Sequence, residues 1–194
     1  MKSTHKSGPV YWGKILLCYS PVVILLLFFK TRTGHDWDMY CFAEWTKAHV
    51  ANGFGHMYSS HTDYLPLYHY FLYFFGLMQE SPGAIEANIY KMKVLTIFFE
   101  FGSTLLLFSL LRRKFRDTWK AFAFSLFYLA NFAVLYNSLI WGQIDGIMAF
   151  FIFGAVVFAF EKRLFPALLM TLLALNLKLH SIIFLPLIIA LVIP

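Results

Sequence analysis

The chain has 194 residues, of which 60% are hydrophobic, 20% are aromatic and only 13% are charged. A soluble domain carries roughly 25% charged residues, so this chain lacks the polar side chains that would cover a soluble globule. The net charge is +6, but the basic residues lie beside apolar runs and not on one polar face, which argues against nucleic acid as a partner. The composition predicts an integral protein of the lipid bilayer.

The first apolar run covers residues 10–29 and is long enough, at about 1.5 Å per residue, to cross a bilayer core of about 30 Å. Lys2 and Lys6 precede it and Lys14 lies near its start, which predicts a cytoplasmic N-terminus. No small-residue cleavage site follows the run, so we expect a retained helix and not a removed signal peptide. The next stretch, residues 30–64, is the most polar of the chain, and residues 31–88 are expected to form an outer loop.

Two helices are predicted within this outer loop. One covers residues 37–51 and lies on the membrane surface, because polar and apolar side chains there follow a helical spacing. Asp36 is its expected N-cap, and Gly53 its expected stop. The other covers residues 65–78, which are too few and too polar for a span, so we expect an interfacial or re-entrant helix started by Pro66.

Basic clusters set the direction of the remaining helices. The apolar run 89–111 ends in the strongest basic cluster of the chain, residues 112–116, which is therefore expected in the cytoplasm. Further passes are expected over residues 121–140, 146–160, 164–175 and 182–193. The sequence thus predicts an all-α, polytopic transmembrane bundle of about six passes, forming a single membrane domain over residues 1–194. Short loops and the lack of a retention signal favour a bacterial inner (plasma) membrane.

Unusual polar residues gather on the outer side of this topology. Ionisable groups at or within a bilayer are costly, so each requires a functional or pairing explanation. A carboxylate can take a proton from an attacking hydroxyl, while lysine and histidine can neutralise a leaving phosphate. These side chains together favour glycosyl transfer from a lipid-phosphate sugar. They are Asp36, Asp38, Asp63, Lys91, Lys93, Gln143, Asp145, Lys178 and His180.

Four segments carry a resemblance to a known family. They are residues 35–40 (HDWDMY), 63–68 (DYLPLY), 141–145 (WGQID) and 177–180 (LKLH), with Pro186 beyond. In order and spacing they are similar to the D-x-D loop, the Y-x-P-L segment, the W-G-Q-x-D turn and the L-K-x-x-P-type segment of GT-C membrane glycosyltransferases. The resemblance is to mannosyltransferases of the GPI-anchor kind and their bacterial relatives. Members of this clan usually have eight or more spans, so we expect this chain to be an N-terminal fragment.

The resemblance implies an inverting transferase that moves a hexose, such as mannose, from a polyprenyl-phosphate sugar to a glycan or lipid-linked acceptor at the outer face. Asp36 is implied as the base and Asp38 as its D-x-D partner. The implied substrate-binding residues are Arg32, Tyr64, Gln143, Asp145, Lys178 and His180. No metal ligand set is expected among the histidines, and a D-x-D pair could hold a divalent cation, Mg²⁺ or Mn²⁺, against a phosphate.

Structural explanations remain open for each of these residues. Asp36 can be only an N-cap, Asp38 only a first-turn acid, and Lys178 only an interfacial side chain that snorkels. A membrane transporter or flippase for a lipid or small solute is the second functional class, because interrupted helices and intramembrane charges also occur there. A fragment without independent activity is the third. Glu100, inside a predicted span, departs from the one-sided pattern.

Overall fold

The computed structural model describes residues 9–29, 33–56, 58 and 62–192. All regular structure in these ranges is helical, which confirms the predicted all-α class. The α-helices are α1 (Pro9–Phe29), α2 (Asp36–Asn52), α3 (Pro66–Leu77), α4 (Pro82–Asn88), α5 (Lys93–Phe115), α6 (Thr118–Leu129), α7 (Phe132–Leu135), α8 (Asp145–Phe160), α9 (Leu164–Leu175) and α10 (Leu185–Val192). Short 3₁₀ segments are η1 (Phe54–His56), η2 (Ile89–Met92) and η4 (Leu179–Phe184), and η3 (Tyr136–Trp141) is a π-helix.

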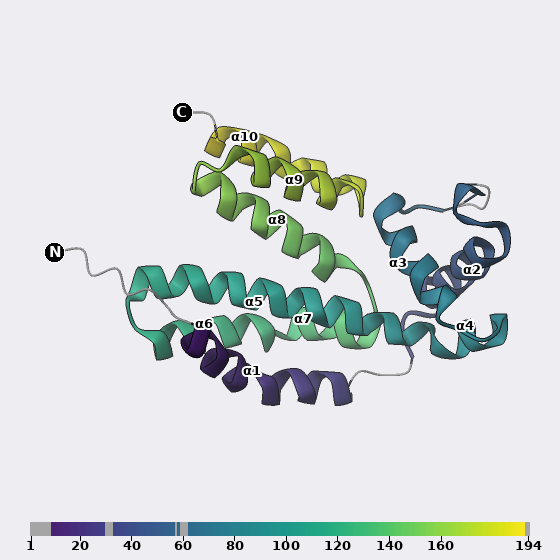
Figure 1. The fold of residues 1–194 in the computed structure, drawn as a ribbon, viewed down its shortest axis with the longest axis horizontal. Coiled ribbons are helices and arrows are strands. Elements are labelled where there is room, and N and C mark those ends of the chain that lie inside the picture. Colours follow the sequence, from purple (N-terminus) through teal and green to yellow (C-terminus); the bar gives the residue numbers. More distant parts are fainter. Residues whose placement is uncertain (1–8, 30–32, 57, 59–61, 193–194) are drawn as a thin grey trace.

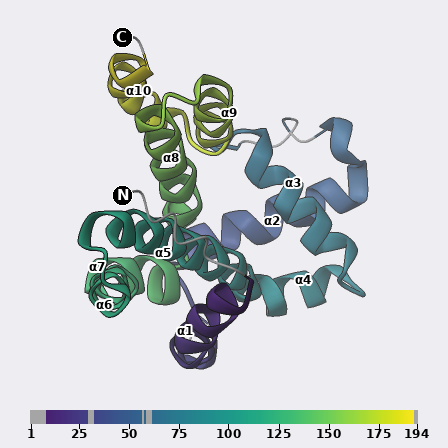
Figure 2. The ribbon, with the colours of Figure 1, turned by 60° about the vertical axis from the view of Figure 1, so that its left-hand side comes forward.

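Helix α5 lies at the centre of the arrangement. Helices α1, α6 and α7 lie along one side of it, and α8, α9 and α10 lie along the other (Figure 1). Helices α2, α3 and α4 form a group of their own at one end of α5, as the turned view also shows (Figure 2). A buried apolar cluster that includes Phe42, Tyr68, Ile147 and Leu177 joins this group to α8 and to the turn after α9.

One helix in the described ranges is long and apolar enough to cross a bilayer. It is the stretch Pro82–Phe115, whose 34 residues run through α4, η2 and α5, and it begins earlier than the predicted start at residue 89. The Ser81 side chain caps it by accepting from the Ala84 backbone N–H (3.2 Å), and Pro82 occupies the first turn. The pair Thr118–Leu129 and Phe132–Trp141 passes the same test only as one span bent by 47°. The remaining apolar helices are shorter.

The predicted helix over residues 121–140 is not continuous. It breaks after α6, and the Asn131 side chain accepts from the Ala133 backbone N–H (2.9 Å), which starts α7. An asparagine in this position competes with the helix and caps a new one. The chain then continues into η3, and this helix ends at Gly142, which has a φ of 88°.

Helix α2 begins one residue earlier than predicted, at Asp36. His35 occupies the N-cap position and makes no side-chain capping bond, so the prediction of Asp36 as N-cap was wrong. Asp36 is the first helical residue, where its charge complements the helix dipole. The predicted buried face is present: Phe42, Trp45 and His49 are buried, and α2 packs with it against α3.

The buried face of α5 is polar and its exposed face is apolar. Phe98 is 67% exposed, whereas Glu100 is 4% exposed and Lys93 is 2% exposed. The Glu100 carboxylate accepts from the Tyr128 hydroxyl (2.6 Å) and from the Ser138 hydroxyl (3.1 Å). This is the reverse of a helix on a soluble core, and polar contacts between helices are a common means of packing in membranes.

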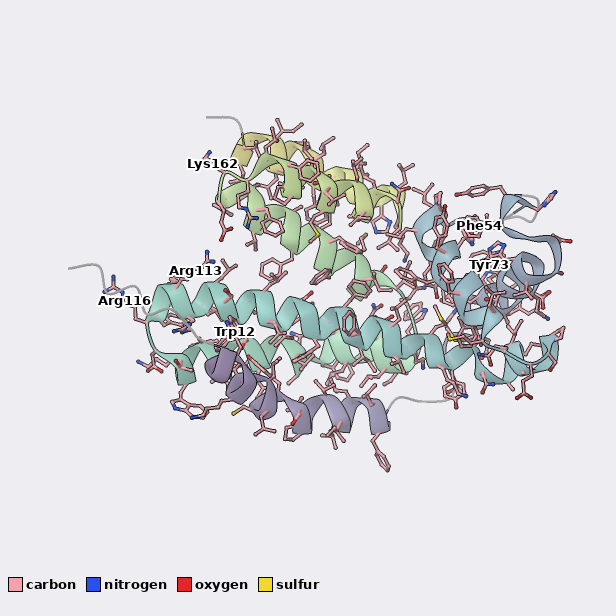
Figure 3. The ribbon with its side chains drawn as sticks, viewed as in Figure 1. Trp12, Phe54, Tyr73, Arg113, Arg116 and Lys162 are labelled. Atoms are coloured by element: carbon pink, nitrogen blue, oxygen red, sulfur yellow. The ribbon has the colours of Figure 1, made fainter. Side chains whose placement is uncertain are left out.

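Basic residues lie at the end of the bundle opposite the α2–α4 group. Arg113, Arg116 and Lys162 are at one end, and Phe54 and Tyr73 are at the other (Figure 3). An ion pair between Arg113 and Glu161 joins the end of α5 to the turn between α8 and α9. The two basic turns therefore share one end of the molecule.

Two buried histidines connect α2 to α3. The Nε2 atom of His69 lies 2.7 Å from the Thr62 hydroxyl and 3.2 Å from the Tyr64 carbonyl. The Nδ1 atom of His69 shares a hydrogen bond with His49 Nε2 (2.9 Å). Burial, followed by the neighbouring His49, lowers the pKa of His69 to about 4, and burial lowers the pKa of His49 as well. Both rings are therefore neutral at pH 7.

This pair predicts a loss of stability in acid. Below a pH of about 6.5 these histidines bind protons in the unfolded chain but stay neutral in the folded one. The free energy of unfolding therefore falls as the pH is lowered, until it reaches about 4. We expect the melting temperature in detergent to fall less steeply over this range in His69→Gln than in the wild type. His56→Gln, which replaces an exposed histidine of the same loop, should keep the wild-type slope. Equal slopes in all three proteins would contradict the assignment.

Candidate functional site

Four segments that are far apart in the sequence meet at the end of the bundle where α2 and α3 begin. We call them the site segments: residues 35–38, 64–67, 141–145 and 176–178. Backbone hydrogen bonds hold them in pairs, since the His35 N–H donates to the Trp141 carbonyl (2.9 Å) and the Leu67 N–H donates to the Asn176 carbonyl (3.0 Å). Main-chain hydrogen bonds thus join the site segments in two pairs, and side chains make the remaining connections.

The Asp38 carboxylate joins the start of α2 to the turn after η3. Its Oδ2 atom accepts from Trp141 Nε1 (2.7 Å) and from Gln143 Nε2 (2.8 Å). The same oxygen lies 3.2 Å from His35 Nδ1, and the His35 ring stacks on the Trp141 ring with centroids 5.2 Å apart. Hydrogen bonds to an ionised acceptor are the strong ones, so Asp38 is held as a fixed acceptor.

The Gln143 side chain connects Asp38 to two further site segments. Because its Nε2 donates to Asp38, its Oε1 faces two donors, the Tyr64 hydroxyl (3.0 Å) and Lys178 Nζ (3.0 Å). This pairing determines which way the amide points. Lys178 Nζ also bonds Asp145 Oδ1 (2.6 Å), so all four site segments belong to one hydrogen-bonded network.

Tyr64 and Lys178 also contact each other directly. The Lys178 ammonium lies 5.0 Å from the centroid of the Tyr64 ring, within the range of a cation–π interaction. Burial, and next the negative charge of Asp38, raise the pKa of the Tyr64 hydroxyl. The hydroxyl therefore stays protonated and acts as the donor to Gln143.

Three of the site residues that the resemblance implies are not in this network. Asp36 is exposed and, within the described ranges, its side chain makes no hydrogen bond or ion pair. His180 is also exposed, in η4, and does not contact the network. Arg32 lies outside the described residues. The sequence-based set thus divides into a connected group (Asp38, Tyr64, Gln143, Asp145 and Lys178) and the exposed pair Asp36 and His180.

Comparisons with protein-family models, with curated proteins and with solved structures returned no match to this chain. The site is therefore interpreted from its own geometry. Within the four site segments as described, carboxylates outnumber lysine and arginine side chains, since Asp36, Asp38 and Asp145 are accompanied by Lys178. In the part of the chain that the structure describes, no three histidine, cysteine or acidic side chains group as a metal site.

Three further residues shape the site, although none of them was assigned an individual role from the sequence. His35 and Trp141 both bond Asp38, and Lys93 holds the main chain beneath them. His35 directly precedes the D-x-D pattern and Trp141 opens the W-G-Q-x-D pattern, so both stood in motifs already recognised. Lys93 gave no such signal, because its partners are backbone carbonyls 46, 47 and 60 residues away.

The Trp141 bond to Asp38 can be tested without any activity. Trp141→Phe keeps an aromatic ring beside His35 and removes the Nε1 donor, so we expect the free energy of unfolding in detergent to fall by about 1 kcal/mol. Trp119→Phe is the matched control, since Trp119 is 68% exposed and lies in the first turn of α6, which follows the basic end of α5. An equal change in both variants would contradict the bond.

Proposed function

We propose that this chain carries the acceptor-activating site of a membrane glycosyltransferase that takes a hexose from a polyprenyl-phosphate sugar. The single observation that supports it most is the contrast between two acids in one D-x-D pattern. Asp38 accepts hydrogen bonds from two other side chains, while Asp36 is exposed and unengaged within the described ranges. One acid orders the site and the other is available for chemistry.

Asp36 is proposed as the general base. It lies in the first turn of α2, where the helix dipole favours the ionised carboxylate that can accept a proton. Asp38 fixes the start of the same helix through the 141–145 segment, so the position of Asp36 is set by its neighbour two residues on. A base held in place in this way lowers the entropic cost of aligning the acceptor.

The proposed reaction is a displacement at the anomeric carbon of the donor. The acceptor hydroxyl oxygen forms the new bond to that carbon as the bond from the carbon to the phosphate oxygen breaks. Polyprenyl phosphate leaves with the electron pair, and Asp36 takes the hydroxyl proton. Phosphate is a good leaving group, so the site needs charge stabilisation there and no second carboxylic acid.

The cations for that phosphate are proposed from the sequence-based set. Lys178 is the ammonium of the network and is 12% exposed at its side chain, with Asp145 and Gln143 setting its direction. Arg32 and His180 are proposed as its companions. The excess of carboxylates also favours a divalent cation, Mg²⁺ or Mn²⁺, between the D-x-D acids and the phosphate.

A multi-pass arrangement in a bilayer is part of this proposal. Large apolar side chains are exposed along the outer helices, which would be costly in water. Basic turns at the end opposite the site fit the rule that positive loops stay in the cytoplasm, so the site would face the outside of a bacterial inner membrane. The apolar side chains include Leu17 and Phe28 of α1, Phe127 of α6, Phe165 and Leu172 of α9, and Leu187 of α10.

A transporter is the second candidate, and Glu100 is the observation that favours it. An ionisable group buried in a candidate span is a functional hypothesis by default. Its carboxylate is, however, already bonded to Tyr128 and Ser138 of the same bundle. The structure thus supplies Glu100 with a packing role, and we place the enzyme first.

The decisive assay supplies membranes containing this chain with radiolabelled polyprenyl-phosphate mannose or glucose and measures sugar transfer. We expect Asp36→Asn to reduce the rate at least about a hundredfold, the range that general-base catalysis contributes. Glu80→Gln removes another exposed carboxylate on the same side of the bundle and should keep the wild-type rate.

Immunoblots of the membrane fraction establish that each variant is inserted and abundant. Equal rates for Asp36→Asn and Glu80→Gln would contradict the role of Asp36 as base. Absence of transfer by abundant wild-type protein with both sugars would contradict the transferase and put the transporter first.

A further inference from the structure

The turn that bonds Asp38 is held in an uncommon backbone conformation. In η3 the Gly142 N–H donates to the Asn137 carbonyl (2.9 Å), five residues back, as a π-helix requires. The last carbonyls of any helix lack donors from the next turn. Trp141 ends this segment and Gln143 follows it, so the backbone of η3 sets the aim of both donors to Asp38.

Lys93 supplies donors to those last carbonyls. Its Nζ donates to the Leu139 carbonyl (2.7 Å) and to the Ile140 carbonyl (3.1 Å). The same ammonium donates to the carbonyl of Thr33, just before α2. Lys93 is 2% exposed, and a cation at a helix C-terminus also meets the negative end of the helix dipole. One buried cation thus ties the end of η3 to the chain that leads into Asp36 and Asp38.

The backbone beside Lys93 is shaped to admit it. A Cβ atom on Gly142 would lie 3.0 Å from Lys93 Cε, and the φ of 88° at this glycine is unfavourable for other residues. Further along α5, Glu100 accepts a hydrogen bond from Ser138, which is also in η3. A Cβ atom on Gly146 would lie 2.2 Å from Glu100 Oε1. The polar face of α5 therefore contacts residues 138–140 of the π segment and the start of α8.

We propose that Lys93 is a positioning residue of the site, whose ammonium keeps η3 in its π conformation and so aims Trp141 and Gln143 at Asp38. Lys93 contacts neither Asp36 nor Asp38 and acts through the backbone. Without its donors the segment relaxes toward an ordinary α-helix, in which a slip of one residue turns the following side chains by about 100°. The effect of Lys93 on sugar transfer rests on the proposed function, whereas its effect on the backbone does not.

Amide hydrogen exchange of the full chain in nanodiscs tests the backbone effect. Lys93→Met removes the donors and keeps the length of the side chain, and Lys93→Arg keeps donors. We expect exchange over residues 136–146 and at the His35 amide to rise about tenfold or more in Lys93→Met and to stay near the wild-type rate in Lys93→Arg. Lys91→Met, which replaces an exposed lysine two residues earlier, is the matched control and should not differ from the wild type.

Helix α9 is the internal reference, because it does not contact Lys93. Unchanged exchange over residues 136–146 in Lys93→Met would overturn the proposal, and so would an equal rise over α9, which would mean a general loss of the fold. If Lys93→Met does not insert, Lys93→Gln retains one amide donor and is expected to give the same local rise to a smaller extent. Exchange confined to other segments would again overturn the proposal.

Kinetics of sugar transfer separate positioning from binding. We expect Lys93→Met to lower kcat about tenfold or more with KM within about twofold, and Lys93→Arg to restore kcat. A local rise in exchange with unchanged kcat would overturn the link to the site while leaving the backbone effect. Absence of transfer in every protein, the wild type included, would count against the proposed function and not against the backbone effect.

Discussion

The arrangement of the site depends on a single carboxylate oxygen. Asp38 Oδ2 accepts from Trp141 and Gln143, side chains more than a hundred residues further along the chain, and from there the network reaches Tyr64, Lys178 and Asp145. A charged acceptor that is only 20% exposed must be well bonded, or its desolvation would not be offset. That requirement forces the start of α2 and the end of η3 together. It also leaves the exposed Asp36, two residues away, at a defined position.

The polar face of α5 provides the support for this arrangement. Lys93 and Glu100 are turned inward and Phe98 is turned outward, and the inward polar groups bond the neighbouring segments. Lys93 secures the carbonyls of η3, and Glu100 secures Ser138. The same helix connects the site at one end to the basic turn at the other, and the ion pair of Arg113 with Glu161 brings α8 into line with it. Helix packing and site geometry thus both depend on the buried polar side chains of α5.

The sequence predicted most helices and less of their detail. Long apolar runs and helical spacing located α1, α2, α3, α5, α8 and α9, because these signals are local in the chain. The break at Asn131, the π-helix before Gly142 and the true cap of α2 were missed, since a competing side-chain bond or a long-range contact decides each. The motifs named Asp38, Tyr64, Gln143, Asp145 and Lys178 in advance, and the structure joins them. Lys93 was only one of several polar residues in the sequence, because its carbonyl partners carry no residue-specific signal.

The central claim is that Asp38 is bonded to the 141–145 segment and Asp36 is not. A double-mutant cycle on the free energy of unfolding in detergent tests this directly, with Asp38→Asn and Gln143→Leu as one pair and Asp36→Asn and Gln143→Leu as the other. We expect a coupling free energy on the order of 1 kcal/mol or more for the first pair and additive effects for the second. Additive effects in the first pair, or coupling only in the second, would contradict it.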